Sequence, residues 1–127
     1  MKRYIALIAS MVIALSCMAT PPNLACLSLF SREDIRQKGH SIVMIQKDDV
    51  RSYSLMAEHD PQLYMQIRDM IEKDRKRATS VIESYESGTM SIQLEIVNNT
   101  EKINIFFKKE KDGHLDLYIS GSNKAFE

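Results

Sequence analysis

The three histidines, His40, His59 and His114, are the side chains most suited to binding a metal or moving a proton near neutral pH. They are far apart and form neither an H-x-x-x-H nor an H-E-x-x-H pair. His114 and Asp116 would share one strand face, but that spacing is common. Because a zinc site would have to assemble from distant segments without a cysteine, we interpret the histidines as surface residues and predict neither a metal nor another cofactor.

One carboxylate, Asp74, interrupts an otherwise apolar helical stripe, and a buried carboxylate is a common general acid. Lys73 and Arg77 are close enough along a helix to pair with it, so we expect Asp74 at the margin of the stripe in an ion pair. The sequence contains no glycine-rich phosphate loop and no G-x-S-x-G motif. We therefore predict a non-enzymatic protein. The alternative is an enzyme or ligand-binding protein whose site at the sheet edge draws on Tyr53, His59 or Asp74.

Two aromatic residues, Phe106 and Tyr118, form the candidate interaction surface. Strand periodicity pairs them on the face of the predicted sheet that is turned away from the helix. An open face of this kind could bind a protein partner, a glycan or a second copy of the chain. Alternatively, residues 27–35 fold over the two rings and cover them.

The charge of the chain gives no reason to expect a nucleic-acid partner. Seventeen basic and seventeen acidic residues cancel, and loss of a leader that contains Lys2 and Arg3 leaves the remainder two charges negative. The basic run at residues 73–77 would spread around a helix instead of forming one stripe. In a lipid-anchored protein this run would be available to anionic headgroups.

Residues 1–19 have the pattern of an export signal. A positive start precedes an uncharged apolar run over residues 5–14, and two prolines follow at positions 21 and 22. Counted from residue 5 to Ala19, the apolar segment falls short of the roughly 20 residues that span a bilayer as a helix. We therefore predict an exported protein, periplasmic or associated with the outer membrane of a Gram-negative bacterium.

Cys17 is the candidate lipidation site, since with Ser16 before it, it resembles the cysteine of a bacterial lipoprotein signal. Ala14 and Leu15 depart from the usual pattern, and ordinary cleavage after Ala19 is the alternative. Cys26 fits the pattern less well. If Cys17 is modified, the membrane is a partner through the lipid.

The rest of the chain divides into a tether at residues 20–26, one α+β domain at 27–121 and a C-terminal tail at 122–127. Residues 27–40 are expected to contain a short helix that packs Phe30 and Ile35 against the domain. The domain is organised around one long helix over residues 60–88, with Asp60 as its N-cap and Gly88 as its end.

Alternating apolar residues predict three hairpins around that helix. In the first, Asp48 and Asp49 form a two-residue turn. In the second, Asn98 and Asn99 form the turn, which sets Ile92 opposite Ile105.

The third hairpin has a choice of loop length. A three-residue loop at 111–113, with Gly113 left-handed, sets Phe107 opposite Leu117 and Phe106 opposite Tyr118. A two-residue turn would spoil the apolar face, so we predict the longer loop.

These elements predict an α+β fold of two layers: an antiparallel sheet of about five strands, in the order β-β-α-β-β-β, with one long helix packed on one face. The pattern is similar to a family of small exported bacterial proteins of unknown function from gut-type anaerobes. The resemblance is carried by residues 42–45 and 50–55, the charged helix and the closing run at 115–121. It implies export and a single α+β domain, and it implies no catalytic residues.

Overall fold

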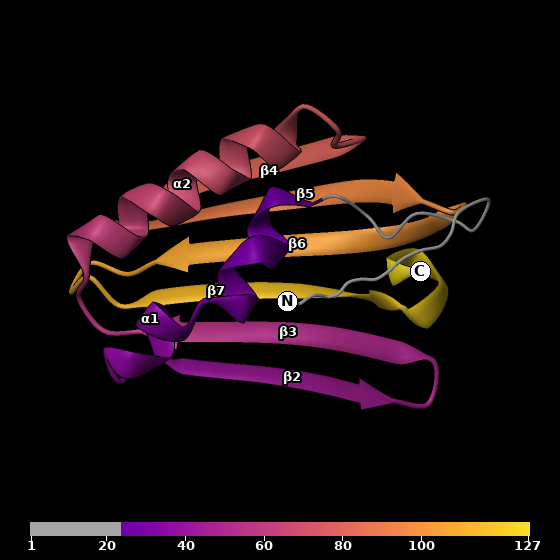
Figure 1. The fold of residues 1–127 in the computed structure, drawn as a ribbon. Helices are drawn as coiled ribbons and strands as arrows, with labels where there is room; N and C mark the ends of the chain where they lie inside the picture. Colours follow the sequence, from indigo (N-terminus) through magenta and orange to yellow (C-terminus); the bar gives the residue numbers. More distant parts are fainter. Residues whose placement is uncertain (1–23) are drawn as a thin grey trace.

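A computed structural model describes residues 24–127, which form a single antiparallel sheet of six strands with helical segments on one side (Figure 1). The C-terminal strand β7 lies in the middle and joins the N-terminal hairpin to the later strands. In spatial order the strands are β2 (Ser41–Lys47), β3 (Val50–Ala57), β7 (Leu115–Ser122), β6 (Glu101–Lys109), β5 (Thr89–Asn98) and β4 (Ser80–Glu86). The predicted two-layer α+β class is confirmed, with six strands instead of about five.

Three helical segments cover one face of the sheet: η1 (Ala25–Ser31), α1 (Glu33–Gln37) and the 15-residue α2 (Pro61–Arg75). A short 3-10 helix, η2 (Asn123–Phe126), follows β7. Strand residues of alternating positions point into the layer between sheet and helices, where Leu94, Ile105 and Phe107 have no exposed surface. Among residues 24–127, no helix is long and apolar enough to cross a membrane.

The central helix begins as predicted but ends much earlier. The Asp60 carboxylate accepts a hydrogen bond from the Leu63 amide at 3.0 Å, and Pro61 takes the first helical position. The helix ends at Arg75, and residues 80–86, predicted as its continuation, form β4. The prediction was wrong because Val81, Ile82 and Tyr85 fit the helical period, whereas their β-branched and aromatic side chains favour a strand.

Two of the three predicted hairpins have the expected register. Met44 pairs with Tyr53 in the first, and Phe107 pairs with Leu117 in the last, where Gly113 has the expected positive φ of 97°. In the second hairpin the turn lies at Asn99 and Thr100, one residue later than predicted. Ile92 is therefore opposite Phe107 instead of Ile105, although the apolar face is unchanged because the pairing shifts by two residues.

The folded domain extends further at both ends than the predicted boundaries. Leu24 and Cys26, placed in the tether, are buried under α2, and η1 begins at Ala25. At the other end, the predicted tail contains η2 and buries Ala125 and Phe126. The export signal and Cys17 lie outside the described residues.

Candidate functional site

The three histidines, distant in sequence, lie at one end of the sheet. His40 immediately precedes β2, His59 follows β3, and His114 precedes β7, and these strands are neighbours in the antiparallel order. Since β2 and β7 start where β3 ends, the loops that carry the histidines lie at the same end of the strands. The interpretation of the histidines as separate surface residues was therefore incomplete.

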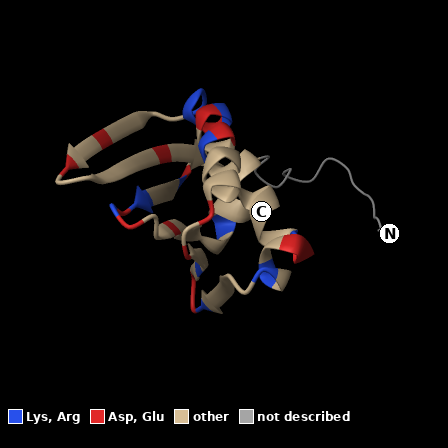
Figure 2. Ribbon diagram, turned by 90° about the vertical axis from the view of Figure 1, so that its left-hand side faces the viewer, with Lys and Arg blue, Asp and Glu red and all other residues tan. Residues whose placement is uncertain are grey.

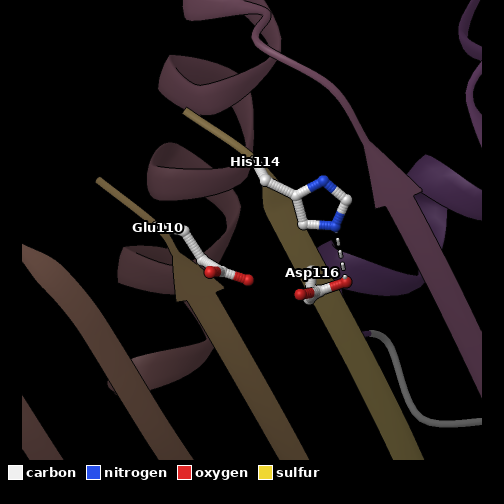
Figure 3. Close-up of side chains that lie close together, drawn as sticks. All are labelled: Glu110, His114 and Asp116. Atoms are coloured by element: carbon white, nitrogen blue, oxygen red, sulfur yellow. Dashed lines mark ion pairs between the residues drawn. The ribbon is translucent and has the colours of Figure 1, made fainter. Parts of the chain in front are cut away.

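Around His114 the structure brings together a cluster of three potential metal ligands, Glu110, His114 and Asp116, here called the hairpin-end cluster (Figure 3). One ligand atom from each residue lies within 4.8 Å of the other two. His114 Nε2 is 3.4 Å from Asp116 Oδ1, and the side chains of His114 and Asp116 are 29% and 27% exposed. The cluster is half-buried on the sheet face turned away from the helices, next to the loop that connects β6 to β7.

Further charged groups surround this cluster. Glu58, at the end of β3, places a carboxylate oxygen 3.6 Å from His114 Nδ1, and its side chain is 90% exposed. Lys108 Nζ lies 3.6 Å from a Glu110 oxygen. Both ring nitrogens of His114 thus face carboxylates, and three acidic groups outnumber one nearby lysine. The local field favours a cation.

The hairpin holds the cluster in a fixed geometry. The Glu110 amide donates to the His114 carbonyl and the Gly113 amide donates to the Glu110 carbonyl, both at 2.9 Å. The His114 amide donates to Asp112 Oδ1 at 3.0 Å. Gly113 is buried, and a Cβ at this position would overlap the His59 ring, so the loop is docked on the β3–α2 connection. Sequence reasoning missed Glu110, although the three-residue loop it predicted already places that residue opposite His114.

His40, the histidine that precedes β2, has a structural partner. Its Nε2 is hydrogen-bonded to Asp60 Oδ2 at 3.0 Å, and Lys38 Nζ lies 3.6 Å from the same oxygen. The His40 hydrogen bond, followed by the hydrogen bond from the Leu63 amide, lowers the pKa of Asp60. These contacts tie the α1–β2 turn to the start of α2, which is a structural role.

Asp74 is buried, not marginal, and this corrects the predicted ion pair at the edge of the stripe. It is only 2% exposed, and its two carboxylate oxygens accept hydrogen bonds from the amides of Ala25 at 2.7 Å and Cys26 at 2.9 Å. It therefore caps the start of η1. Burial, reinforced by the charge of Asp74, raises the pKa of the Cys26 thiol. These contacts give Asp74 a structural role.

The basic run at residues 73–77 extends past the end of α2 at Arg75. Arg75 forms ion pairs with Glu83 on β4 and, at 3.5 Å, with Glu72. Figure 2 shows both basic and acidic residues on the helix at the top of the view. The expectation that residues 73–77 do not form one basic stripe stays a prediction.

Phe106 and Tyr118, the candidate interaction surface, are paired on adjacent strands on the face opposite the helices. Tyr118 is 44% exposed and Phe106 is half-buried. The alternative in which residues 27–35 cover the two rings is wrong, because Phe30 and Ile35 pack into the core on the other side. Phe30 contacts the Tyr53 ring there, with ring centroids 5.5 Å apart.

The alternative site residues, Tyr53, His59 and Asp74, are not brought together. Tyr53 lines two neighbouring hollows of about 410 and 380 Å³ beside β2, and neither is lined by His59 or Asp74. His59 packs on the β6–β7 loop and Asp74 lies under η1. In the described part of the chain, these three residues lie in separate places.

The fold and its features define a two-layer α+β domain with one bare sheet face and a His–carboxylate cluster at one end of that face. The chain belongs to a family of unknown function (DUF6108), whose model matches residues 12–125. The expectation of an uncharacterised family is thus confirmed, while export and the gut-type source stay predictions.

Among solved structures, the chain is similar to the crystal structure of a DUF4853 family protein from Actinomyces odontolyticus ATCC 17982. The two share 14% identity with a TM-score of 0.39, and the match covers 77% of this chain and 62% of that chain. The chain therefore spans less than two thirds of that protein, and so distant a likeness indicates no shared function. The comparison with curated proteins found no match.

Proposed function

We propose that this chain is an exported bacterial envelope protein, held by lipid on Cys17, that works without catalysis by pairing its open sheet face with that of a second copy. The leader pattern and the cysteine after Ser16 support export and lipidation. The observation that carries the contact role is the asymmetry of the sheet. Helices cover one face of residues 24–127, whereas Phe106 and Tyr118 lie at the middle of a face on which no described helix packs.

The residues of the open face are arranged so that the same face of a second copy is complementary to it. Reading across the sheet from β4 to β2, one row of paired residues consists of Ile82, Gln93, Phe106, Tyr118, Ser54 and Val43. Apolar side chains end the row, an amide and a hydroxyl come next, and the aromatic pair is central. Two sheets packed face to face lie about 10 Å apart with nearly aligned strands.

Consider a two-fold axis that lies midway between the two sheets, parallel to the strands and over the boundary between β6 and β7. It would place complementary groups of the two copies opposite one another. It would set Phe106 against Tyr118 of the second copy. In the next row, it would set Lys108 against Asp116 of that copy, opposite in charge. An isologous contact of this kind closes after two copies. Self-complementarity in both apolar and charged rows is the reason for choosing a second copy over a different protein or a glycan.

The test is the mass of the processed protein in solution, measured by light scattering and sedimentation over a concentration series. We expect the unaltered protein to show twice the chain mass, and the Phe106→Glu, Tyr118→Glu variant to show the single-chain mass. Met65→Glu, which adds a carboxylate to an exposed apolar residue of α2, is the matched control and should keep the doubled mass. A single-chain mass for the unaltered protein, or a doubled mass for the double variant, would refute this contact.

Lipidation is tested separately by the intact mass of the form that a bacterial host produces. A diacyl or triacyl mass beginning at Cys17 is expected. An unmodified form beginning at Thr20 would show a soluble exported protein and would leave the contact proposal standing, since that proposal depends on the open face alone.

A further inference from the structure

The geometry of the hairpin-end cluster points to a second property of this protein, independent of the proposed pairing. We propose that Glu110, His114 and Asp116 bind a divalent transition-metal ion such as Zn²⁺ or Co²⁺, with water completing the coordination. One imidazole and two carboxylates form a donor set that such ions accept, and an open position is typical of zinc sites with three protein ligands.

The separation of the ligand atoms matches the size of such a site. Zinc bonds to nitrogen and oxygen are about 2.0–2.2 Å long, so two ligands at a tetrahedral angle lie roughly 3.3–3.5 Å apart. His114 Nε2 and Asp116 Oδ1 are 3.4 Å apart, which is longer than the 2.7–3.2 Å typical of a hydrogen bond. Glu110 lies within 4.8 Å of both, and small side-chain rotations would bring its oxygen to the same centre. Figure 3 shows the three side chains converging on one side of the hairpin.

The second ring nitrogen of His114 provides an independent observation. Metal-binding histidines usually donate their other N–H to a carboxylate or a carbonyl, which fixes the tautomer. Glu58 lies 3.6 Å from Nδ1, on the opposite side of the ring from Asp116, as this arrangement requires. Its side chain is 90% exposed, so we expect its contribution to be smaller than that of the three ligands.

The ligands need little reorganisation, because the backbone that carries them is already fixed. Glu110 and His114 are joined across the loop by the hairpin hydrogen bonds, and Asp116 follows in the paired strand β7. Lys108 competes for Glu110 at 3.6 Å and must move aside when an ion binds. Its side chain is 36% exposed, so it can turn away from Glu110, either to solvent or to Asp116 of a second copy.

The experiment titrates the chelator-treated, processed protein with zinc chloride by calorimetry, and with cobalt chloride by visible absorbance. We expect one ion per chain. His114→Gln and Asp116→Asn should each weaken binding at least roughly tenfold, because even the outer partners of metal ligands typically contribute that much. Glu58→Gln should weaken it less. Asp69→Asn, which neutralises an exposed carboxylate on α2 that is not part of the cluster, is the matched control and should bind as the unaltered protein does.

A measurement on the unaltered protein keeps the proposal testable if a variant fails to fold. Paramagnetic Mn²⁺ or Co²⁺ should broaden the amide NMR signals of residues 110, 114 and 116 before any others. Absence of zinc binding, broadening centred elsewhere, or unchanged affinity in folded His114→Gln would each overturn the site.

The site and the proposed pairing fail separately. The Phe106→Glu, Tyr118→Glu variant should still bind one zinc ion, because neither aromatic residue is a ligand. Asp116 would take part in both, because Oδ1 lies 3.4 Å from His114 Nε2 and a carboxylate has a second oxygen that can accept from Lys108 of the second copy.

Discussion

Replacing Asp74 should strongly destabilise the fold, although it removes only a small side chain. Its carboxylate receives the amides of Ala25 and Cys26, which are 49 and 48 residues away in the chain. Asp74→Ala removes both acceptors and leaves two N–H groups at the start of η1 without a partner. The Cys26 residue has no exposed surface, whereas Ala25 is partly exposed and its amide can bind water instead.

An unpaired buried amide at Cys26 costs about 1–3 kcal/mol and the lost charged hydrogen bond of Ala25 about 1.5–3 kcal/mol, so we expect Asp74→Ala to lower the free energy of unfolding by about 2.5–6 kcal/mol. For a domain of about 100 residues this corresponds to a fall in Tm of roughly 10 °C or more. Asp74→Asn keeps one oxygen but turns an amino group toward the second N–H, and should lose about half as much.

Urea unfolding followed by circular dichroism measures these differences. Asp69→Ala, an exposed aspartate on the same helix, is the control and should change stability by less than about 0.5 kcal/mol. If Asp74→Ala were as stable as this control, the buried carboxylate would not be holding η1, and our account of the N-terminal segment would be wrong.

Three further outcomes are expected. The Cys26 thiol, whose pKa is raised by burial, should not react with a disulfide reagent at pH 8 until urea unfolds the protein; rapid labelling of the folded form would contradict its position. Because the pKa of Asp60 is lower in the folded protein, its ionised carboxylate stabilises the fold above about pH 4, and this stabilisation is lost as pH falls through the lowered pKa. His40→Ala should flatten the pH dependence of urea unfolding in that range. Gly113→Ala should destabilise by about 2 kcal/mol or more, because φ is positive and an imidazole occupies the Cβ position, whereas Gly39→Ala, with a positive φ and open space, should cost less in a thermal melt.

The sequence predicted the register of two hairpins because each of those registers rests on a local constraint. In the last hairpin, only the three-residue loop keeps Phe107 opposite Leu117, and the structure has that loop. In the second, two adjacent asparagines gave no basis for choosing between neighbouring turns, and a shift by two residues leaves every apolar side chain facing the core. Turn position was therefore the weaker inference.

The failures arose where distant segments decide the outcome. Val81 and Ile82 fit the helical period, but their β-branched side chains favour a strand, and pairing with β5 selects the strand. The partners of Asp74 are backbone amides near the N-terminus, which no spacing rule could identify. The hairpin-end cluster was partly predictable, since His114 and Asp116 were recognised as neighbours. Glu110 needed the loop length to be combined with the search for ligands.

If Cys17 carries lipid as proposed, the hydrogen bonds from Ala25 and Cys26 to Asp74 also limit how far the domain can lie from the bilayer. Leu24 is buried next to this hydrogen-bonded segment, so the described domain begins there and not at the predicted residue 27. From a lipidated Cys17, the seven residue steps to Leu24 span about 25 Å even when fully extended. A connection this short would keep the domain close to the headgroups, with its N-terminal end facing them. Two copies anchored in one leaflet would meet already confined to a thin layer, with far fewer relative orientations to search before their open faces pair.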